Sequence, residues 1–195
     1  MIDRSVKIER RSFFSRIFIA YKNFSLSFRQ QRDICIGERD LLFLVFTGTL
    51  ILFMANLPVQ LVRGSILLGV DVRTYVGLIG FVSLFFVPLL LYFLAGFLFL
   101  IFKVVGGSST FYELRLAVFW SLNVAGPLIV LNGFLKGLFF GSDGIEYVSI
   151  VLQSYIAWII SSIIMEAEKF KSKLPMFFIL ISFVIMPLFS ELIVI

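Results

Sequence analysis

The sequence predicts an all-α, polytopic membrane protein, a bundle of five transmembrane helices with its N-terminus in the cytoplasm and its C-terminus on the opposite side. Composition, apolar segments and the placement of basic residues lead to this fold class. Of the 195 residues, 60% are hydrophobic and 15% are charged, whereas soluble domains are about half apolar and a quarter charged. Phenylalanine alone supplies 25 residues. A soluble fold of this size has too little polar surface to cover so much hydrocarbon.

Five segments are long and apolar enough to cross a bilayer. A transmembrane helix needs about 20 mostly apolar residues, because each residue rises about 1.5 Å across a hydrocarbon core of about 30 Å. A polar or glycine-rich break follows each of the first four segments. We therefore expect a membrane domain over 41–195, with helices at about 41–62, 75–102, 116–140, 146–165 and 174–195.

The orientation follows from the basic residues, because Lys and Arg resist translocation while acids matter little. Nine of the 17 basic residues precede residue 41, and five more lie in the second and fourth breaks. Three remain for the other side of the membrane: Arg63, Arg73 and Lys136. This split of fourteen to three places the N-terminus inside.

Residues 1–40 form a basic cytoplasmic arm. Within it, apolar residues recur every three or four positions between basic ones, the pattern of an amphipathic helix. Such a helix either lies in the membrane interface, with its basic face toward anionic lipid head groups, or packs on the bundle as a cytosolic helix. The apolar positions are Phe14, Ile17, Phe18, Tyr21, Phe24 and Phe28.

Polar residues in the first span cluster near its outer end. Asn56, Pro58 and Gln60 lie in the motif ANLPVQLVR, which we expect to break the helix and free backbone carbonyls. Polar groups inside a bilayer are candidates for function because they are costly unless paired. The alternative is a helix end that frays at the interface.

Polar and kink residues in later spans favour helix packing. Asn123 and Pro127 lie four positions apart on one face of the third span. The Asn123 amide is expected to bond carbonyls released by the proline, or a neighbouring helix. Gly133 and Gly137 form a G-x-x-x-G pair that allows close helix contact, and Gln153 flanks a small-residue stripe in the fourth span.

The cytoplasmic break GGSSTFYELR, which begins at Gly106, is the most distinctive local pattern. Its glycines are expected to end one helix, and Ser108 to Thr110 to cap the next, with Glu113 in the first turn. Arg115 then enters the third span at the membrane edge. It is a candidate to reach lipid phosphates or to form an ion pair with Glu113 or Glu166.

The sequence contains no recognisable catalytic, nucleotide-binding or metal-binding motif. A P-loop, a dinucleotide fingerprint, a nucleophile elbow and metal-ligand spacing are missing, and the chain has no histidine and a single cysteine, Cys35. We expect a protein that is not an enzyme and has no catalytic residues, cofactor, metal or nucleic-acid partner. The expected partners are the lipid bilayer, anionic lipids through the basic arm, and a second copy or another membrane protein.

Two stretches resemble the bacterial branch of the Yip family, the Ypt/Rab-interacting membrane proteins. They are ERDLLFLVFTGTLILFMANLPVQLVRGS over 38–65 and GGSSTFYELRLAVFWSLNVAGPLIVL over 106–131. The resemblance covers the chain from about Arg29 onward and implies a five-helix bundle in the bacterial cytoplasmic (inner) membrane. Eukaryotic members bind prenylated GTPases, but their Asp-Leu-Tyr-Gly-Pro pattern has no counterpart here, so GTPase binding is not carried to any residue.

Two functions of different classes are therefore expected. The first is a non-enzymatic scaffold or adaptor in membrane organisation or trafficking-like processes. The alternative is a small-solute or ion transporter or channel subunit, built around Asn56, Gln60, Asn123 and Gln153.

Overall fold

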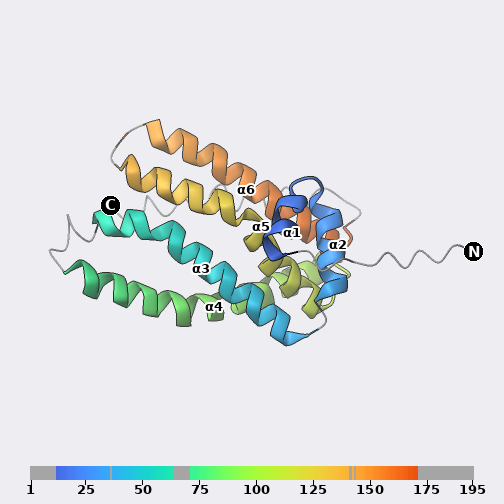
Figure 1. Ribbon diagram of the computed structural model, residues 1–195. Coiled ribbons are helices and arrows are strands. Elements are labelled where there is room, and N and C mark those ends of the chain that lie inside the picture. Colours follow the sequence, from blue (N-terminus) through green and yellow to red (C-terminus); the bar gives the residue numbers. More distant parts are fainter. Residues whose placement is uncertain (1–11, 36, 64–70, 141, 143, 171–195) are drawn as a thin grey trace, which may run out of the picture.

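The computed structural model describes residues 12–35, 37–63, 71–140, 142 and 144–170. These residues form six α-helices (Figure 1). Two short helices, α1 and α2, precede four long ones. The fifth predicted span, at about 174–195, lies outside the described residues. The helices are α1 Phe13–Ala20, α2 Phe24–Ile34, α3 Glu38–Arg63, α4 Val72–Val104, α5 Phe111–Leu138 and α6 Gly144–Glu168.

The four long helices are each long and apolar enough to cross a membrane, which confirms the first four predicted spans as candidates. They run back and forth side by side, with α1 and α2 at one end of the bundle (Figure 1). We call this end the arm end. α4 and α5 begin earlier than their apolar stretches because polar caps extend them. Asp71 accepts a hydrogen bond from the Thr74 backbone N–H at 3.4 Å, and Thr110 caps α5.

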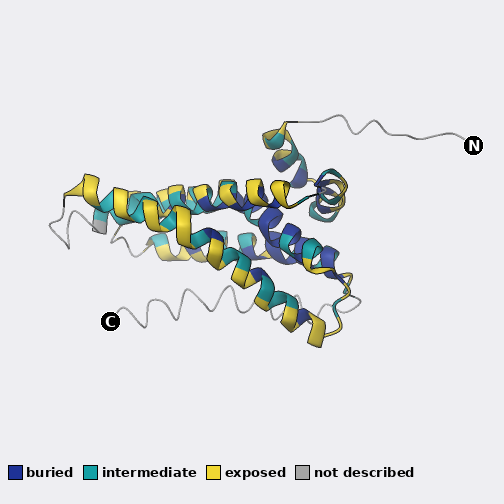
Figure 2. Cartoon of the chain, turned by 90° about the horizontal axis from the view of Figure 1, so that it is seen from below, coloured by how far each residue is buried: buried dark blue, intermediate teal, exposed yellow. Residues whose placement is uncertain are grey.

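The helix α5 is the centre of the bundle. It packs against α3 on one side and α6 on the other, and its first half is buried from Leu114 to Gly126 apart from two partly exposed positions. Figure 2 shows the buried residues gathered toward the arm end. By contrast, α4 buries Pro88, Ala95 and Phe102 and exposes most of its large apolar side chains. In a bilayer such an apolar face suits lipid or another membrane helix.

Close packing between α3 and α5 depends on glycines of α5. A methyl group added at Gly133 would overlap the carbonyl oxygen of Ala55, and one at Gly137 would overlap Pro58. The predicted role of this G-x-x-x-G pair, close helix contact, is therefore confirmed.

The expected helix break at Pro58 is wrong. α3 continues through Pro58 to Arg63. A proline removes one backbone hydrogen bond of the helix and does not end it when packing holds both sides. Here Pro58 packs against α5 at Gly137.

The N-terminal arm forms two helices rather than the single amphipathic helix expected. The Asn23 side chain accepts a hydrogen bond from the Leu26 N–H at 2.9 Å and starts α2. Because asparagine is a strong N-cap, a new helix starts there although the apolar residues keep their spacing across it. The arm packs on the bundle through α5 and α6, while Phe14 and Phe18 stay 70% and 68% exposed.

The glycines and Thr110 of the Gly106–Thr110 turn act as the sequence predicts, whereas Ser108 and Ser109 bond Glu168 and do not cap α5. Gly106 has φ +93°, and the Gly107 N–H donates to the Phe102 carbonyl at 2.7 Å, so α4 ends in a Schellman motif. Thr110 and Glu113 then form a capping box at the start of α5.

Candidate functional site

The predicted polar residues of the spans do not meet at one place. Asn56 is exposed and donates to the Leu52 carbonyl of its own helix at 2.9 Å. Gln153 donates to Ser149 on its own helix at 3.3 Å. Gln60 accepts from the Tyr75 hydroxyl at 2.8 Å, which joins α3 to α4. These three side chains do not form a common path with Asn123.

Asn123 joins two helices from a fully buried position. Its Nδ2 donates to the carbonyl oxygens of Leu44 on α3 and Phe119 on α5, both at 2.8 Å. The Oδ1 atom is buried and has no hydrogen-bond partner in the described part of the chain. Pro127 is exposed, and the carbonyls that Asn123 bonds belong to Leu44 and Phe119. The amide therefore bonds the neighbouring helix and its own backbone.

Arg115 lies near the start of α5 at the arm end, and its partner is Glu38 rather than Glu113 or Glu166. Its terminal nitrogens contact the two Glu38 oxygens at 3.0 and 2.6 Å. The guanidinium carbon lies 4.6 Å from the ring centre of Phe111, within a cage that Tyr92 and Tyr112 complete at 5.8 and 5.9 Å. This bidentate and stacked geometry suits arginine and not lysine.

Two further ion pairs bind the arm to the bundle. Arg29 of α2 contacts Glu166 of α6 at 2.6 Å, and this ion pair raises the pKa of Arg29. Arg32 contacts Glu113 of α5 at 3.4 Å. We call the three pairs Arg29–Glu166, Arg32–Glu113 and Arg115–Glu38 the ion-pair belt. The belt links α2, α3, α5 and α6 at the arm end.

A buried carboxylate next to the belt was missed by sequence reasoning. Glu168, at the end of α6, is 1% exposed and accepts hydrogen bonds from the Ser109 hydroxyl at 2.5 Å and the Ser109 N–H at 3.2 Å. Its backbone carbonyl accepts from Ser108. Two serines in a turn suggest capping of the next helix, and no local signal shows that they instead hold a glutamate 59 positions away.

Polar contacts from the arm also reach into the bundle. The Tyr21 hydroxyl donates to the Val124 carbonyl at 2.8 Å, and Trp120 donates to the Ser27 hydroxyl at 3.1 Å. Burial raises the pKa of Tyr21 to about 12, with a smaller contribution from Tyr155. Burial likewise raises the pKa of the Cys35 thiol, so the thiol stays protonated and unreactive.

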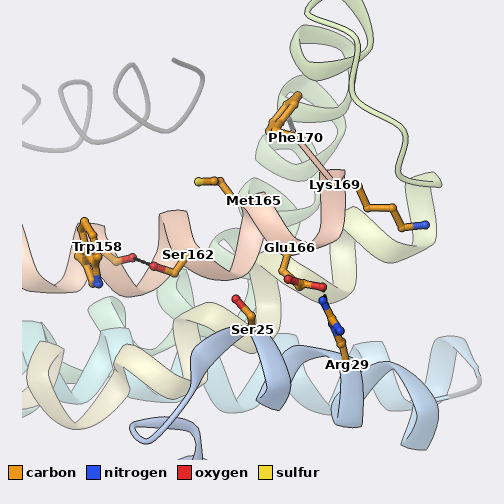
Figure 3. Close-up of a pocket in the computed structure, with 8 residues that line it drawn as sticks. All are labelled: Ser25, Arg29, Trp158, Ser162, Met165, Glu166, Lys169 and Phe170. Carbon is orange, nitrogen blue, oxygen red and sulfur yellow. Dashed lines mark hydrogen bonds and ion pairs between the residues drawn. The ribbon is translucent and has the colours of Figure 1, made fainter. Parts of the chain in front are cut away.

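A cleft of about 460 Å³ lies between α2 and α6 beside the belt (Figure 3). It carries two cations, one carboxylate, two hydroxyls and three large apolar side chains. The lining residues are Ser25 and Arg29 of α2, Trp158, Ser162, Met165 and Glu166 of α6, and Lys169 and Phe170 just after it.

A metal site of three or more His, Cys, Asp or Glu side chains is absent from the described residues. Comparison of the chain with protein families, curated proteins and solved structures finds no match. The resemblance to the Yip family therefore rests on the sequence itself, through the two stretches, the number of predicted helices and the loop spacing.

Proposed function

We propose that this chain is a non-enzymatic scaffold or adaptor of Yip type in the bacterial cytoplasmic membrane, with five spans, the N-terminus inside and the C-terminus outside. It would act through helix packing, lipid contact and a second copy or another membrane protein. The observation that supports the proposal is how the polar side chains of the predicted spans are hydrogen-bonded. Asn123 joins α5 to α3, and Gln60 accepts from Tyr75 of α4, so these amides serve cohesion.

The alternative, a transporter or channel subunit, has less support. It needs polar groups that face a shared path. Asn56 and Gln153 each bond their own helix, and Asn123 lies at the contact between α3 and α5. In the described part of the chain, the four predicted residues do not come together in one site, which favours the scaffold.

The test measures assembly and solute binding on the same preparation. The full chain is purified in mild detergent, its mass is determined by light scattering, and the same chain is cross-linked in native membranes. Phe93→Cys provides the cross-linking site, because Phe93 is 72% exposed on the helix with the least burial. Cys35→Ala removes the native thiol, which is buried.

A reproducible oligomer, or a co-purifying membrane protein, supports the scaffold. A strictly monomeric chain that binds a solute saturably, and whose flux in proteoliposomes is abolished by Asn123→Ala with folding intact, contradicts it and favours the transporter.

A further inference from the structure

We propose that the cleft between α2 and α6 binds one anionic phospholipid, with the lipid phosphate between Arg29 and Lys169 and an acyl chain along Trp158. The inference rests on the membrane location of the bundle and adds to the proposed scaffold a defined lipid ligand. It does not depend on an oligomer or a protein partner.

The charged lining residues of the cleft all lie at the arm end, where Met165 and Phe170 also line it, and the deeper part is lined by the uncharged Trp158 and Ser162. Glu166 and Lys169 lie at the arm end of the helix, whereas Trp158 lies eight residues before Glu166, about 12 Å deeper at helical rise. Ser162 stands between them, and its hydroxyl already donates to the Trp158 carbonyl at 2.7 Å. The deeper part of the cleft therefore offers no free hydroxyl and suits hydrocarbon. A phospholipid has the same profile, with a charged head and an apolar chain.

The charged end of the cleft suits a phosphate. Arg29 uses its Nε to contact Glu166 (Figure 3), and its side chain remains 61% exposed, so a ligand can reach its guanidinium group. Lys169 lines the cleft just after the end of α6 and is exposed, with φ +53°. Its side chain extends away from Glu166 in Figure 3, and because it is long and exposed it can turn toward a phosphate at the rim. Guanidinium and ammonium groups are the usual protein ligands of phosphate.

The charge balance favours an anionic lipid over a zwitterionic one. The lining holds two cations, Arg29 and Lys169, and one carboxylate, Glu166, which is already paired with Arg29. Lys169 also interacts with Glu113 of α5, outside the lining, but that carboxylate is paired with Arg32. A choline or ethanolamine head group would bring an ammonium against this net positive lining. A glycerol head group brings only hydroxyls, for which Ser25 at the mouth is a neutral partner.

The size of the cleft fits a head group with the upper part of one chain. Ligand pockets commonly measure about 300 to 1,000 Å³, and this cleft measures about 460 Å³. Trp158 is 49% exposed, so the cleft opens toward the surrounding solvent or lipid. The rest of the lipid would remain in the bilayer.

The experiment uses the fluorescence of Trp158, which lies in the cleft, in full-length protein reconstituted into phosphatidylcholine nanodiscs. A small fraction of brominated phosphatidylglycerol or brominated phosphatidylcholine is added, because bromine quenches a tryptophan that it contacts. The second tryptophan, Trp120, is 1% exposed, and Trp158→Phe measures its background. We expect stronger quenching by the brominated anionic lipid than by the brominated choline lipid.

Each removed charge should lower this preference by about fivefold, the factor expected per basic residue near an anionic lipid. Lys169→Gln is the primary variant because it breaks none of the three ion pairs of the belt, and Arg29→Gln is the second. Arg29→Lys keeps the charge and should retain most of the preference. Lys103→Gln is the matched control, since Lys103 is an exposed cation at the end of α4, also at the arm end.

Three results would overturn the site. Equal quenching by both brominated lipids shows no selectivity, and an equal effect of Lys103→Gln and Lys169→Gln shows only general surface charge. Loss of the preference on adding inorganic phosphate shows a site for soluble phosphate rather than lipid. All three leave the scaffold proposal standing, because that proposal fails only if the chain is monomeric and binds or moves a solute.

Discussion

Asn123 holds α5 to α3 through a side-chain amide that is fully buried. We expect Asn123→Ala to lower the free energy of unfolding by about 0.6 to 1.7 kcal/mol, the range for hydrogen bonds between membrane helices. Asn123→Asp should cost more, because a carboxyl oxygen would then face the carbonyl oxygens of Leu44 and Phe119. Unfolding in mixed micelles with rising dodecyl sulfate, followed by circular dichroism, measures both variants.

The matched control is Asn56→Ala, which removes an exposed amide that bonds its own helix. Its effect should stay within about 0.5 kcal/mol, as for most surface substitutions. If Asn56→Ala and Asn123→Ala destabilise the protein equally, the interhelical role of Asn123 is refuted.

Arg115 offers a second prediction for a single residue. Because it contacts Glu38 through two nitrogens and lies 4.6 Å from the Phe111 ring centre, lysine cannot replace it. A double-mutant cycle with Arg115→Lys and Glu38→Gln should give a coupling energy of about 1 kcal/mol, the upper end for exposed pairs. Micelle unfolding of the four proteins yields this coupling.

Arg32→Lys serves as the control for Arg115→Lys. Arg32 makes one contact of 3.4 Å to Glu113, so lysine should serve there nearly as well. Equal losses in the two lysine variants would show that the bidentate and stacked geometry of Arg115 has no effect on stability.

At the scale of the helices, the close contact between α3 and α5 depends on glycines, which have no side chain. A methyl group at Gly133 would overlap the Ala55 backbone, which cannot move as a flexible side chain does. We expect Gly133→Ala to lower the free energy of unfolding by about 1 to 3 kcal/mol, the usual cost of overpacking. Thermal unfolding in detergent detects a loss of this size.

The control for Gly133→Ala is Gly77→Ala in α4, where a methyl group meets no atom of the described chain within 4 Å. Alanine favours helix over glycine by up to about 1 kcal/mol, so this variant should be neutral or more stable. The same substitution is thus expected to act in opposite directions. A loss at Gly77 as large as at Gly133 would contradict the close-contact explanation.

At the scale of helices, contacts between residues near in sequence could be predicted, whereas contacts between residues far apart in sequence could not. The capping box of Thr110 and Glu113 and the turn at Gly106 follow from neighbouring residues, so the sequence predicts them. The partner of Arg115 is 77 positions away, and Glu38 competes with nearer acids that periodicity cannot rank. The split of the arm at Asn23 was also missed, because apolar residues on both sides keep the same spacing.

For the whole molecule, the decisive property is which side each end of the bundle faces. The four described long helices place the arm, the turn between α4 and α5 and the end of α6 at one end (Figure 1). This is the end that carries the greater share of basic residues in the sequence. The order of the helices therefore agrees with the division of charge, and residues 1 and 170 are expected on the cytoplasmic side.

Fusions after successive breaks test this topology, including the span at about 174–195 that lies outside the described residues. Alkaline phosphatase, active outside the cytoplasm, should be active after residues 69, 142 and 195. A fluorescent protein that matures only inside should be bright after residues 107 and 170. If residue 195 reports the same side as residue 170, the fifth segment does not cross the membrane. If residue 107 reports the outside, the basic residues do not set the orientation, because that turn adjoins Lys103 and Arg115.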